Sequence, residues 1–410
     1  MPELAWLDAV PGEAAFYADD LMAIRAGAKH DGFAYLGEPI TPGHRAVRSP
    51  SRALLLRVET AAGAVGWGDA VSVQYAGVGG RDAPVDPAVL GVEVDFAALA
   101  LQRAGEFDFA AGCQLIEELR FDGRPLHTAV RYGISQALLN ATAAEAGSSP
   151  LRILAAITGL TEPELLPVYA QSGDERELNA DRMILRAVDV LPHGLFNSLD
   201  SFGHDGQRFL DYVAWLRRRV DELGPAGYRP SLHLDVYGML GQVVSLDVDR
   251  MATFLAAAET AAGGLDLAVE SPCYGADGAE TVELLAHLRS TLRERGVSVS
   301  LVADEFCNTD ADVAQFVAAE AVDLIQIKMP DLGCLTEAIA AAKVCRDAGL
   351  GVFIGGSCAE TEVSAIASAQ VALAVEADQV LAKPGMGVDE GVTIVRNAMR
   401  RALVDWERTS

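Results

Sequence analysis

The sequence lacks the features that mark several classes of protein. It holds 32 Lys and Arg residues against 58 Asp and Glu residues, which gives a formal net charge of −26. Binding to a nucleic-acid backbone depends on clustered basic residues that release counterions, so this balance argues against a nucleic-acid partner. The chain has no uninterrupted apolar run of about 18 residues and no basic segment at its start. We therefore expect neither membrane insertion nor secretion.

Cysteine is also scarce. The six cysteines are scattered along the chain and form no C-x-x-C pair. The sequence thus shows neither the density of a disulfide scaffold nor the spacing of a zinc site. This pattern favours a reducing compartment, and we expect a cytoplasmic protein in which most cysteines are small buried hydrophobic residues.

The composition is typical of a globular protein with more than one domain. Half of the residues are apolar and 22% are charged, and 410 residues exceed what one core usually holds. Residues 1–160 combine strand-like apolar stretches with a long helical pattern, so we expect an α+β N-terminal capping domain there. Residues 161–410 follow a different pattern and form the second expected domain.

In this second part, short β-branched apolar runs alternate with helical segments. The expected strands cover residues 166–172, 188–194, 231–238, 266–273, 299–306, 323–330, 351–356 and 378–385. Such an alternation indicates a parallel sheet, and eight units predict a closed (β/α)8 barrel of the TIM type. The second strand is the least distinct, because residues 194–200 compete for its place.

Three successive strands of this expected barrel end in a carboxylate: Asp235, Glu270 and Asp304. Reactive groups of such barrels lie at the carboxyl ends of the strands, and neighbouring strands are about 4.8 Å apart. Several hard oxygen ligands that leave room for water and substrate suit Mg²⁺, whereas zinc is disfavoured because no His or Cys shares this spacing. A single carboxylate at a strand end is more often a helix cap or a surface ion pair, but three in succession favour a metal site.

Two other residues of the expected barrel are candidate proton acceptors. Lys328 lies in the apolar sixth strand on the same side as Gln326. Burial and a nearby divalent cation both lower the pKa of a lysine, so Lys328 is a candidate general base; the alternative is a structural ion pair with one of the carboxylates. His193, near the end of the second strand, would lie opposite Lys328 as a second base. Flanked by Pro192 and Gly194, it can equally be a loop residue.

Two glycine-containing segments carry further hypotheses. The glycine-rich segment 76–83 is a candidate mobile loop, because glycine tolerates the dihedral angles of a hinge. Cys358 follows two glycines at a strand end, which is compatible with a nucleophile. No histidine lies near it in sequence to form a thiolate pair, so we favour a direct contact between Cys358 and a substrate.

The order Asp, Glu, Asp and then Lys on successive strands is similar to that of the enolase superfamily, which uses Lys or His bases together with Mg²⁺. Several motifs narrow the resemblance to the methylaspartate ammonia-lyase family. They are SVQYAGVGGRD (72–82), ESPCYG (270–275), DEFCNT (304–309), QIKMPDLG (326–333), GGSCAET (355–361) and AKPGMGVDEG (382–391). The resemblance extends over nearly the whole chain.

This resemblance implies a reaction and a set of site residues. The reaction is the reversible elimination of ammonia from threo-3-methylaspartate to mesaconate, in amino-acid catabolism. Mg²⁺ would be bound by Asp235, Glu270 and Asp304, with Lys328 as the base for the L-threo substrate and His193 as the base on the opposite face. The implied substrate site consists of Gln74 at the amino group, Gln326 and His193 at the metal-bound carboxylate, Gln171, Ser357 and Cys358 at the other carboxylate, and Leu381 in the pocket wall.

The resemblance also implies K⁺ as an activator and, by analogy with the superfamily, a homodimer. The chain departs from the family at Ser357, where other members carry Thr; either hydroxyl can donate to a carboxylate. Another enolase-superfamily enzyme, an epimerase, dehydratase or cycloisomerase that acts through a metal-stabilised enolate, is the alternative. Such enzymes commonly carry K-x-K on the second strand, where this chain has PHGLFNS without lysine. A catalytically silent barrel that binds a ligand or partner is a further alternative.

Overall fold

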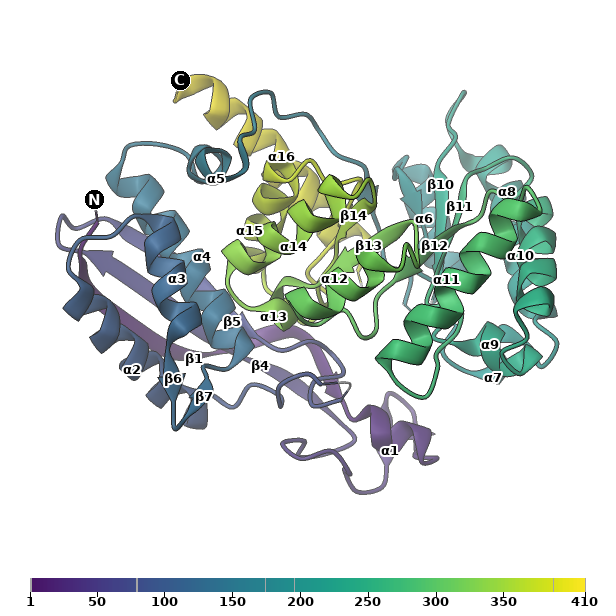
Figure 1. Cartoon of the computed structure of the whole chain (residues 1–410), viewed down its shortest axis with the longest axis horizontal. Helices are drawn as coiled ribbons and strands as arrows, with labels where there is room; N and C mark the ends of the chain where they lie inside the picture. The colour runs from purple at the N-terminus through teal and green to yellow at the C-terminus, as the bar shows by residue number, and fades with distance from the viewer. Residues whose placement is uncertain (1, 79, 174, 195, 386, 410) are drawn as a thin grey trace.

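The computed structural model describes residues 2–78, 80–173, 175–194, 196–385 and 387–409. A three-stranded antiparallel sheet and its helices lie beside a closed barrel (Figure 1). The sheet has the order β1-β4-β5, formed by β1 (Leu4–Asp19), β4 (Arg48–Thr60) and β5 (Val65–Val71). Helices α2 (Pro87–Ala104), α3 (Phe109–Glu118) and α4 (Thr128–Glu145) lie along it. The N-terminal part is therefore α+β, as the sequence predicted.

Helix α4 packs unusually close to strand β5. A Cβ atom added to Gly68 would lie 2.0 Å from the backbone oxygen of Gly133, and one added to Gly66 would lie 2.1 Å from that of Ala137. Because a side chain at either strand position would collide with the helix backbone, glycine at both positions allows this contact. The two glycines therefore allow β5 to lie directly against the backbone of α4.

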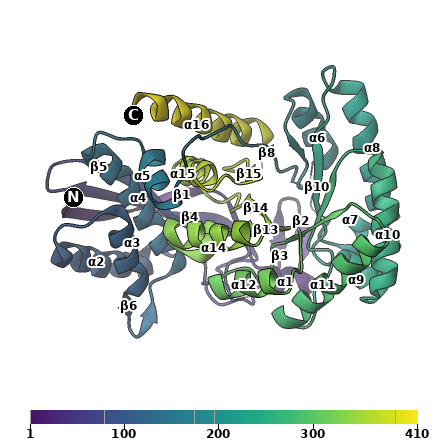
Figure 2. The same ribbon diagram turned by 45° about the horizontal axis from the view of Figure 1, so that its top comes forward.

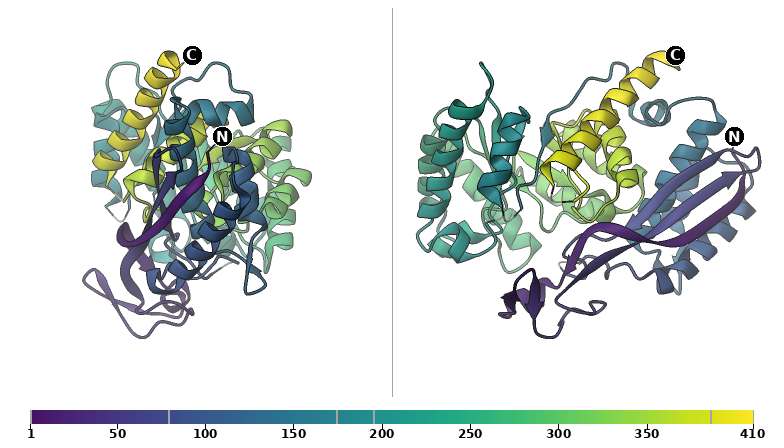
Figure 3. Two further views of the ribbon diagram at one scale, coloured as in Figure 1. Left: turned by 90° about the vertical axis from the view of Figure 1, so that its left-hand side faces the viewer. Right: turned by 180° about the vertical axis from the view of Figure 1, so that it is seen from behind.

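A short segment projects from the far end of the sheet. It contains helix α1 (Leu21–Arg25) and a hairpin of β2 (Lys29–Asp31) and β3 (Ala34–Leu36). Figure 3 shows β1 and β4 extending from the sheet to this segment. A small hairpin of β6 (Arg120–Phe121) and β7 (Arg124–Pro125) lies between α3 and α4, and the N-terminal part ends with α5 (Pro150–Thr158).

The barrel is closed by eight parallel strands in the order β10-β11-β12-β13-β14-β15-β8-β9. They are β8 (Val168–Tyr169), β9 (Val190–Leu191), β10 (Ser231–Asp235), β11 (Leu267–Glu270), β12 (Ser300–Ala303), β13 (Leu324–Ile327), β14 (Gly351–Ile354) and β15 (Gln379–Leu381). Each lies within its predicted range, and the second strand does not use residues 194–200. The predicted (β/α)8 barrel is confirmed.

The helices around the barrel are α6 (Arg176–Leu185), α7 (Leu199–Phe202), α8 (Gln207–Leu223), α9 (Met239–Val244), α10 (Val248–Ala262), α11 (Gly278–Glu294), α12 (Asp310–Ala318), α13 (Met329–Leu332), α14 (Leu335–Asp347), α15 (Glu362–Ala374) and α16 (Val388–Arg408). The last of these, α16, packs against both α15 and α5 and so ties the barrel to the N-terminal part (Figure 2). None of the described helices is both long and apolar enough to cross a membrane.

The observed barrel strands end earlier than the sequence predicted. Residues beyond their carboxyl ends leave the hydrogen-bonded ladder: Lys328, for example, follows β13 and is the N-cap residue of α13 instead of lying within the strand. The strands are mostly apolar and buried, with His233, Gln326 and Gln379 as buried polar exceptions. Inside the barrel Tyr169, Val190, Phe353 and Leu381 form a small hydrophobic cluster. The polar residues after the strands are thus free to line a site at this end of the barrel.

Candidate active site

A cavity of about 60 Å³ lies at the carboxyl ends of the barrel strands and is closed in part by the N-terminal part. The predicted site residues that line it are Gln74, Gln171, His193, Asp304, Gln326, Lys328, Ser357, Cys358 and Leu381. Two other predicted residues, Asp235 and Glu270, are buried, with 1% and 0% of their surfaces exposed. A larger cavity of about 940 Å³, between the α1 segment and α7 and α9, shares Gln74 with the first.

The carboxylates of Asp235 and Glu270 end the adjacent strands β10 and β11, where they are direct partners in register. One ligand atom from each of these residues, and one from His193, lie within 4.8 Å of one another. Burial, followed by the charges of neighbouring carboxylates, raises the pKa of Asp235 and of Glu270 well above the usual range. Two acidic groups so close together in a buried position are suited to a bound cation.

Glu270 is oriented by two polar neighbours inside the barrel. Gln326 donates from Nε2 to its Oε1 at 2.8 Å. On the other side, His233 Nε2 lies 2.8 Å from Oε2, although neither of these two atoms completes a hydrogen bond. This buried oxygen therefore keeps acceptor capacity that a metal ion can use.

Asp304 follows β12 and is bound to Lys328. Lys328 Nζ lies 2.6 Å from Asp304 Oδ1 and 2.7 Å from Oδ2. Burial is the largest single cause and lowers the pKa of Lys328, but the neighbouring carboxylates, Asp304 first among them, together outweigh it, and the net change is a raised pKa. The ion pair that the sequence analysis gave as the alternative is therefore present, and burial does not by itself bring the pKa of Lys328 below its usual value; its role as a base stays a prediction. Lys328 nevertheless lines the cavity.

His193 is held between neighbouring barrel strands by its backbone. Its N–H donates to the Ala170 oxygen and its oxygen accepts from the Asp235 N–H, each at 3.0 Å. The ring Nε2 lies 3.5 Å from Asp235 Oδ2. Burial, followed by the charges of His233 and Lys328, lowers the pKa of His193 to about 3, so its ring is neutral at ordinary pH. The strand that His193 follows, β9, lies four positions in the closed barrel from β13, the strand that precedes Lys328.

The remaining predicted residues line the wall between the barrel and the N-terminal part. Gln74 donates from Nε2 to Asp19 Oδ2 at 3.0 Å, and its Oε1 accepts from Cys358 Sγ at 3.6 Å. Burial is the main cause that raises the pKa of Cys358 to about 12, so the side chain is a thiol and not a nucleophilic thiolate. Gln171 Nε2 is buried and has no hydrogen-bond partner among the described residues, so it can donate to a ligand.

The structure adds cavity residues that the sequence analysis missed, notably Arg81 and Glu305. Arg81 donates from Nε to Asp331 Oδ2 at 2.8 Å and lies 3.4 Å from Glu305 Oε2. Arg81 belongs to the segment 76–83 that was expected to be a mobile loop; Gly79 lies outside the described residues. Two signals in the sequence could have indicated these residues. Arg81 is a charged residue among glycines, and Glu305 directly follows the predicted metal ligand Asp304.

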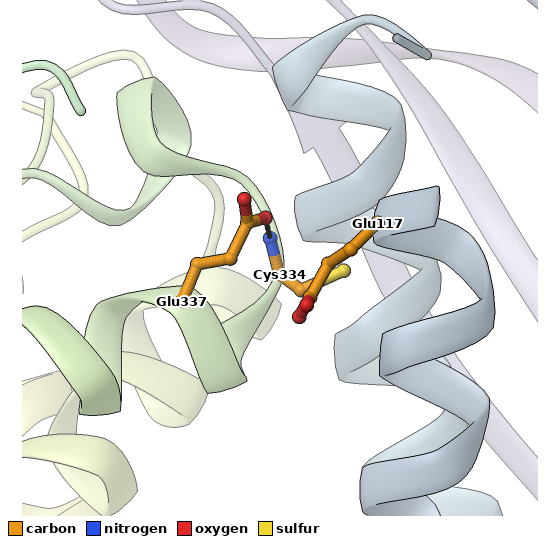
Figure 4. A group of neighbouring side chains, drawn as sticks. All are labelled: Glu117, Cys334 and Glu337. Atoms are coloured by element: carbon orange, nitrogen blue, oxygen red, sulfur yellow. Dashed lines mark hydrogen bonds between the residues drawn. The ribbon is translucent and has the colours of Figure 1, made fainter. Parts of the chain in front are cut away.

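A second group with metal-ligand atoms lies at the contact between α3 and α14 (Figure 4). Its members are Glu117, Cys334 and Glu337, and their atoms also lie within 4.8 Å of one another. Arg131 already neutralises Glu337 at 2.5 Å, and the Cys334 N–H donates to Glu337 Oε2 at 2.7 Å. Thr336 donates to Glu117 at 2.5 Å. The carboxylates of Glu117 and Glu337 therefore already accept hydrogen bonds that join the N-terminal part to the barrel. For this reason we assign no metal to the group.

Comparisons with known proteins agree with this arrangement. The family models of the methylaspartate ammonia-lyase N-terminus and C-terminus match residues 4–158 and 161–408. The chain is 45% identical to methylaspartate ammonia-lyase of Haloarcula marismortui, over 98% of this chain and 96% of that protein. It is 39% identical to the enzyme of Citrobacter amalonaticus, over 96% of both.

Solved structures show the same relationship. The structure of β-methylaspartase from Clostridium tetanomorphum, described as a Mg-complex, has a TM-score of 0.94 and 38% identity, and covers 100% of both chains. A muconate lactonizing enzyme from Pseudomonas fluorescens shares only 18% identity, over 92% of this chain and 87% of that one, and its TM-score of 0.63 reflects the fold alone. The chain therefore belongs to the methylaspartate ammonia-lyase family, whose members are carbon–nitrogen lyases.

Proposed function

We propose that the chain eliminates ammonia from threo-3-methylaspartate to give mesaconate, and catalyses the reverse amination. The observation that carries this proposal is the position of the Lys328 ammonium and a cluster of buried carboxylates at one small cavity. The relative from Citrobacter amalonaticus has been solved with (2S,3S)-3-methylaspartic acid, at 38% identity and a TM-score of 0.94. A small amino dicarboxylate is therefore the proposed substrate.

Mg²⁺ is the proposed cofactor, held by Asp235, Glu270 and Asp304. The donor set supports this choice, because buried carboxylate oxygens that raise one another's pKa are suited to a hard divalent cation. A ring nitrogen of His193 also lies within 4.8 Å of carboxylate oxygens of Asp235 and Glu270. Because a nitrogen ligand is less suited to Mg²⁺, we propose His193 as a base and not as a metal ligand. When bound, Mg²⁺ would act as a Lewis acid on the substrate carboxylate next to C3 and so acidify the C3 proton.

The residues of the chain have separate tasks in this proposal. A cation held by Asp304 would weaken the Lys328–Asp304 ion pair and favour the neutral amine of Lys328. As that neutral amine, Lys328 would accept the C3 proton of the L-threo substrate, and His193 would act on the opposite face, for the L-erythro epimer. Gln326 and His193 donate to the carboxylate next to C3, where negative charge develops. Gln171, Ser357 and Cys358 bind the other carboxylate, Gln74 contacts the amino group and Leu381 packs against the substrate.

We further propose that residues 1–160 form a capping domain and residues 161–410 the catalytic barrel. The proposal includes activation by K⁺, which the family resemblance implies, and a homodimer, by analogy with the superfamily. It also places the chain in the cytoplasm, on the basis of its scattered cysteines. The acidic surface does not prevent binding of an anionic substrate, because Lys328 and Arg81 supply positive charge at the cavity.

A spectroscopic assay tests the proposed function. Purified chain is incubated with 3-methylaspartate or aspartate and Mg²⁺, and the conjugated alkene is followed by ultraviolet absorption with and without a chelator. We expect alkene formation that needs Mg²⁺ and that is faster with 3-methylaspartate. Epimerisation of 3-methylaspartate in place of ammonia release would contradict the proposal and would favour another enolase-superfamily reaction.

A further inference from the structure

Lys383 is a fully buried lysine that has no task in the proposed reaction. It follows β15 and has 0% of its surface exposed. Its Nζ donates to the Gly355 oxygen at 2.7 Å and to Glu360 Oε2 at 2.8 Å. Removing an ammonium group from water is costly unless charge and hydrogen bonds compensate for it. Here both compensating contacts are made with one short segment, the loop of residues 355–361 that follows β14.

Glu360 connects the same loop to two other parts of the molecule. Its side chain is also 0% exposed. Oε2 accepts from the Ser357 N–H at 2.7 Å, while Oε1 accepts from the Tyr132 hydroxyl at 2.7 Å. Tyr132 belongs to α4 of the N-terminal part. One carboxylate thus joins the loop, Lys383 and the helix that packs on β5.

The loop is shaped around this ion pair. Gly356 has φ +139°, and a Cβ atom there would lie 2.1 Å from Glu360 Oε2 and 2.2 Å from Lys383 Nζ. Only glycine can therefore occupy this position next to the pair. The next two residues, Ser357 and Cys358, line the cavity directly. Because Gly356 directly precedes Ser357 and Cys358, a shift of the ion pair would move these two residues of the cavity wall.

A second contact fixes the other end of the loop. Thr361 donates its hydroxyl to Asp69 Oδ2, and Ser364 donates to the same oxygen at 3.1 Å. Asp69 lies on β5 of the N-terminal sheet, and Ala15 of β1 donates from its N–H to the Ala359 oxygen at 3.0 Å. The loop is therefore held from the barrel by Lys383 and from the N-terminal sheet by these contacts.

We infer that Lys383 and Glu360 are positioning residues, which hold Gly355–Cys358 in the shape that lets Ser357 and Cys358 receive the substrate carboxylate not bound by the metal. This inference rests on the proposed function, which assigns that carboxylate to Ser357 and Cys358. A pair needed for folding alone would leave substrate affinity unchanged once the fold is restored. A positioning pair controls affinity even in a fully folded chain.

The test separates these two roles by a double-mutant cycle in the full-length chain. Lys383→Met and Glu360→Leu each leave one buried charge or its hydrogen-bond partners unsatisfied, so both single variants are expected to unfold at lower temperature. The double variant contains no unpaired charge and is expected to recover much of this loss. We expect its KM for 3-methylaspartate to remain raised about tenfold or more, with kcat changed less than about threefold, which is the sign of lost ground-state binding. A double variant with the KM of the unmodified chain overturns the inference.

Arg289→Met is the matched control. Arg289 forms a partly buried ion pair with Asp323 at 2.7 Å, before β13 and so at the amino end of the barrel. This variant is expected to lose thermal stability and to keep the KM of the unmodified chain. An equal rise in KM in the control would mean that general destabilisation explains the effect, and it would overturn the inference.

Two further measurements keep the result decisive. If the double variant gives no folded protein, Tyr132→Phe is the second test, because it removes one hydrogen bond to Glu360 and leaves the ion pair intact. We expect its KM to rise about two- to fivefold. An unchanged KM overturns the inference.

Binding of mesaconate in the presence of Mg²⁺, measured by calorimetry, gives a readout without turnover. An unmodified chain that binds mesaconate but releases no ammonia contradicts the proposed function alone, whereas variants that bind mesaconate as tightly as the unmodified chain contradict the positioning role alone.

Discussion

Two clusters of buried carboxylates lie near the cavity, and they differ in how their charge is balanced. In the first, Asp235 and Glu270 face each other with raised pKa values, and the nearest cation, Lys328, is bound to Asp304. In the second, Glu360 has its own cation, Lys383, together with donors from the loop and from α4. The first cluster holds more negative charge than Lys328 balances, whereas the Glu360 carboxylate has a lysine and two further donors of its own.

This difference separates a site from a structural connection. Burial alone does not distinguish the clusters, because Glu270 and Glu360 are each 0% exposed. The two carboxylates differ in their counter-charge: Glu360 is paired with Lys383, whereas the lysine nearest to Glu270 in the site is bound to Asp304. A carboxylate left with acceptor capacity and repelled by its neighbours is ready for a metal ion, whereas one that accepts from three donors is already satisfied.

The largest expected effect comes from removing the lysine of the first cluster. For Lys328→Ala we expect deamination of the L-threo substrate to fall by about 10²–10⁴-fold or more, because a positioned general base contributes that much. The ultraviolet assay measures the loss, and the rise in unfolding temperature on adding Mg²⁺ checks that the metal still binds. Lys343→Ala is the control, since Lys343 lies on the surface in an ion pair with Asp347 at 2.8 Å. Undiminished turnover in Lys328→Ala would refute its assignment as the base.

The second effect concerns the opposite face of the cavity. His193→Ala is expected to reduce turnover of the L-erythro epimer much more than that of the L-threo epimer, because only the former needs a base on that side. Rates on the two purified epimers, compared under saturating Mg²⁺, measure this selectivity. An equal loss on both epimers would show that His193 mainly binds substrate.

The third prediction tests the balance of charge directly. In the presence of chelator, Glu270→Gln is expected to raise the unfolding temperature by a few degrees, because it removes one of two buried charges that repel each other. Glu360→Gln is expected to lower it, because it leaves Lys383 without its counter-charge. Calorimetry of both variants measures the sign. A fall in unfolding temperature for Glu270→Gln would contradict the contrast between the clusters.

The smallest effect is a change in the pH dependence of stability. Burial raises the pKa of Asp69 from 3.8 to about 6 in the folded chain. The folded state therefore binds this proton more tightly than the unfolded state, and the resulting stability is complete below about pH 4 and is lost as the pH rises through about 6. Asp69→Asn should remove about 1–3 kcal/mol of this dependence, measured by urea unfolding between pH 4 and pH 7. A variant with the same slope as the unmodified chain would show that other groups cause it.

Much of the fold could be read from the sequence. The eight apolar runs predicted the barrel strands, since buried parallel strands are short and apolar on both faces. The carboxylates at three successive strand ends predicted where acidic side chains would gather, because neighbouring parallel strands end at the same edge. The predicted site residues Gln74 and Ser357 followed from family motifs and not from any physical pattern.

Other features required the folded chain. Arg81 and Asp331 are 250 positions apart in the chain and become partners only when the N-terminal part closes over the barrel. The pKa of Lys328 depended on its distance from Asp304, which strand order alone does not give. Lys383 lies in a motif quoted for its resemblance, yet nothing in the motif indicates that its side chain is turned toward Glu360.

The sequence by itself determined the element order, the closed barrel and the end of the barrel at which the acidic groups lie, because apolar periodicity and strand-end position are local properties of the chain. Only the tertiary structure decided which acidic groups keep free acceptor capacity and which are neutralised by a lysine of the chain. Electrostatic balance in a buried site depends on distances of a few ångströms between residues far apart in sequence, and only folding sets these distances.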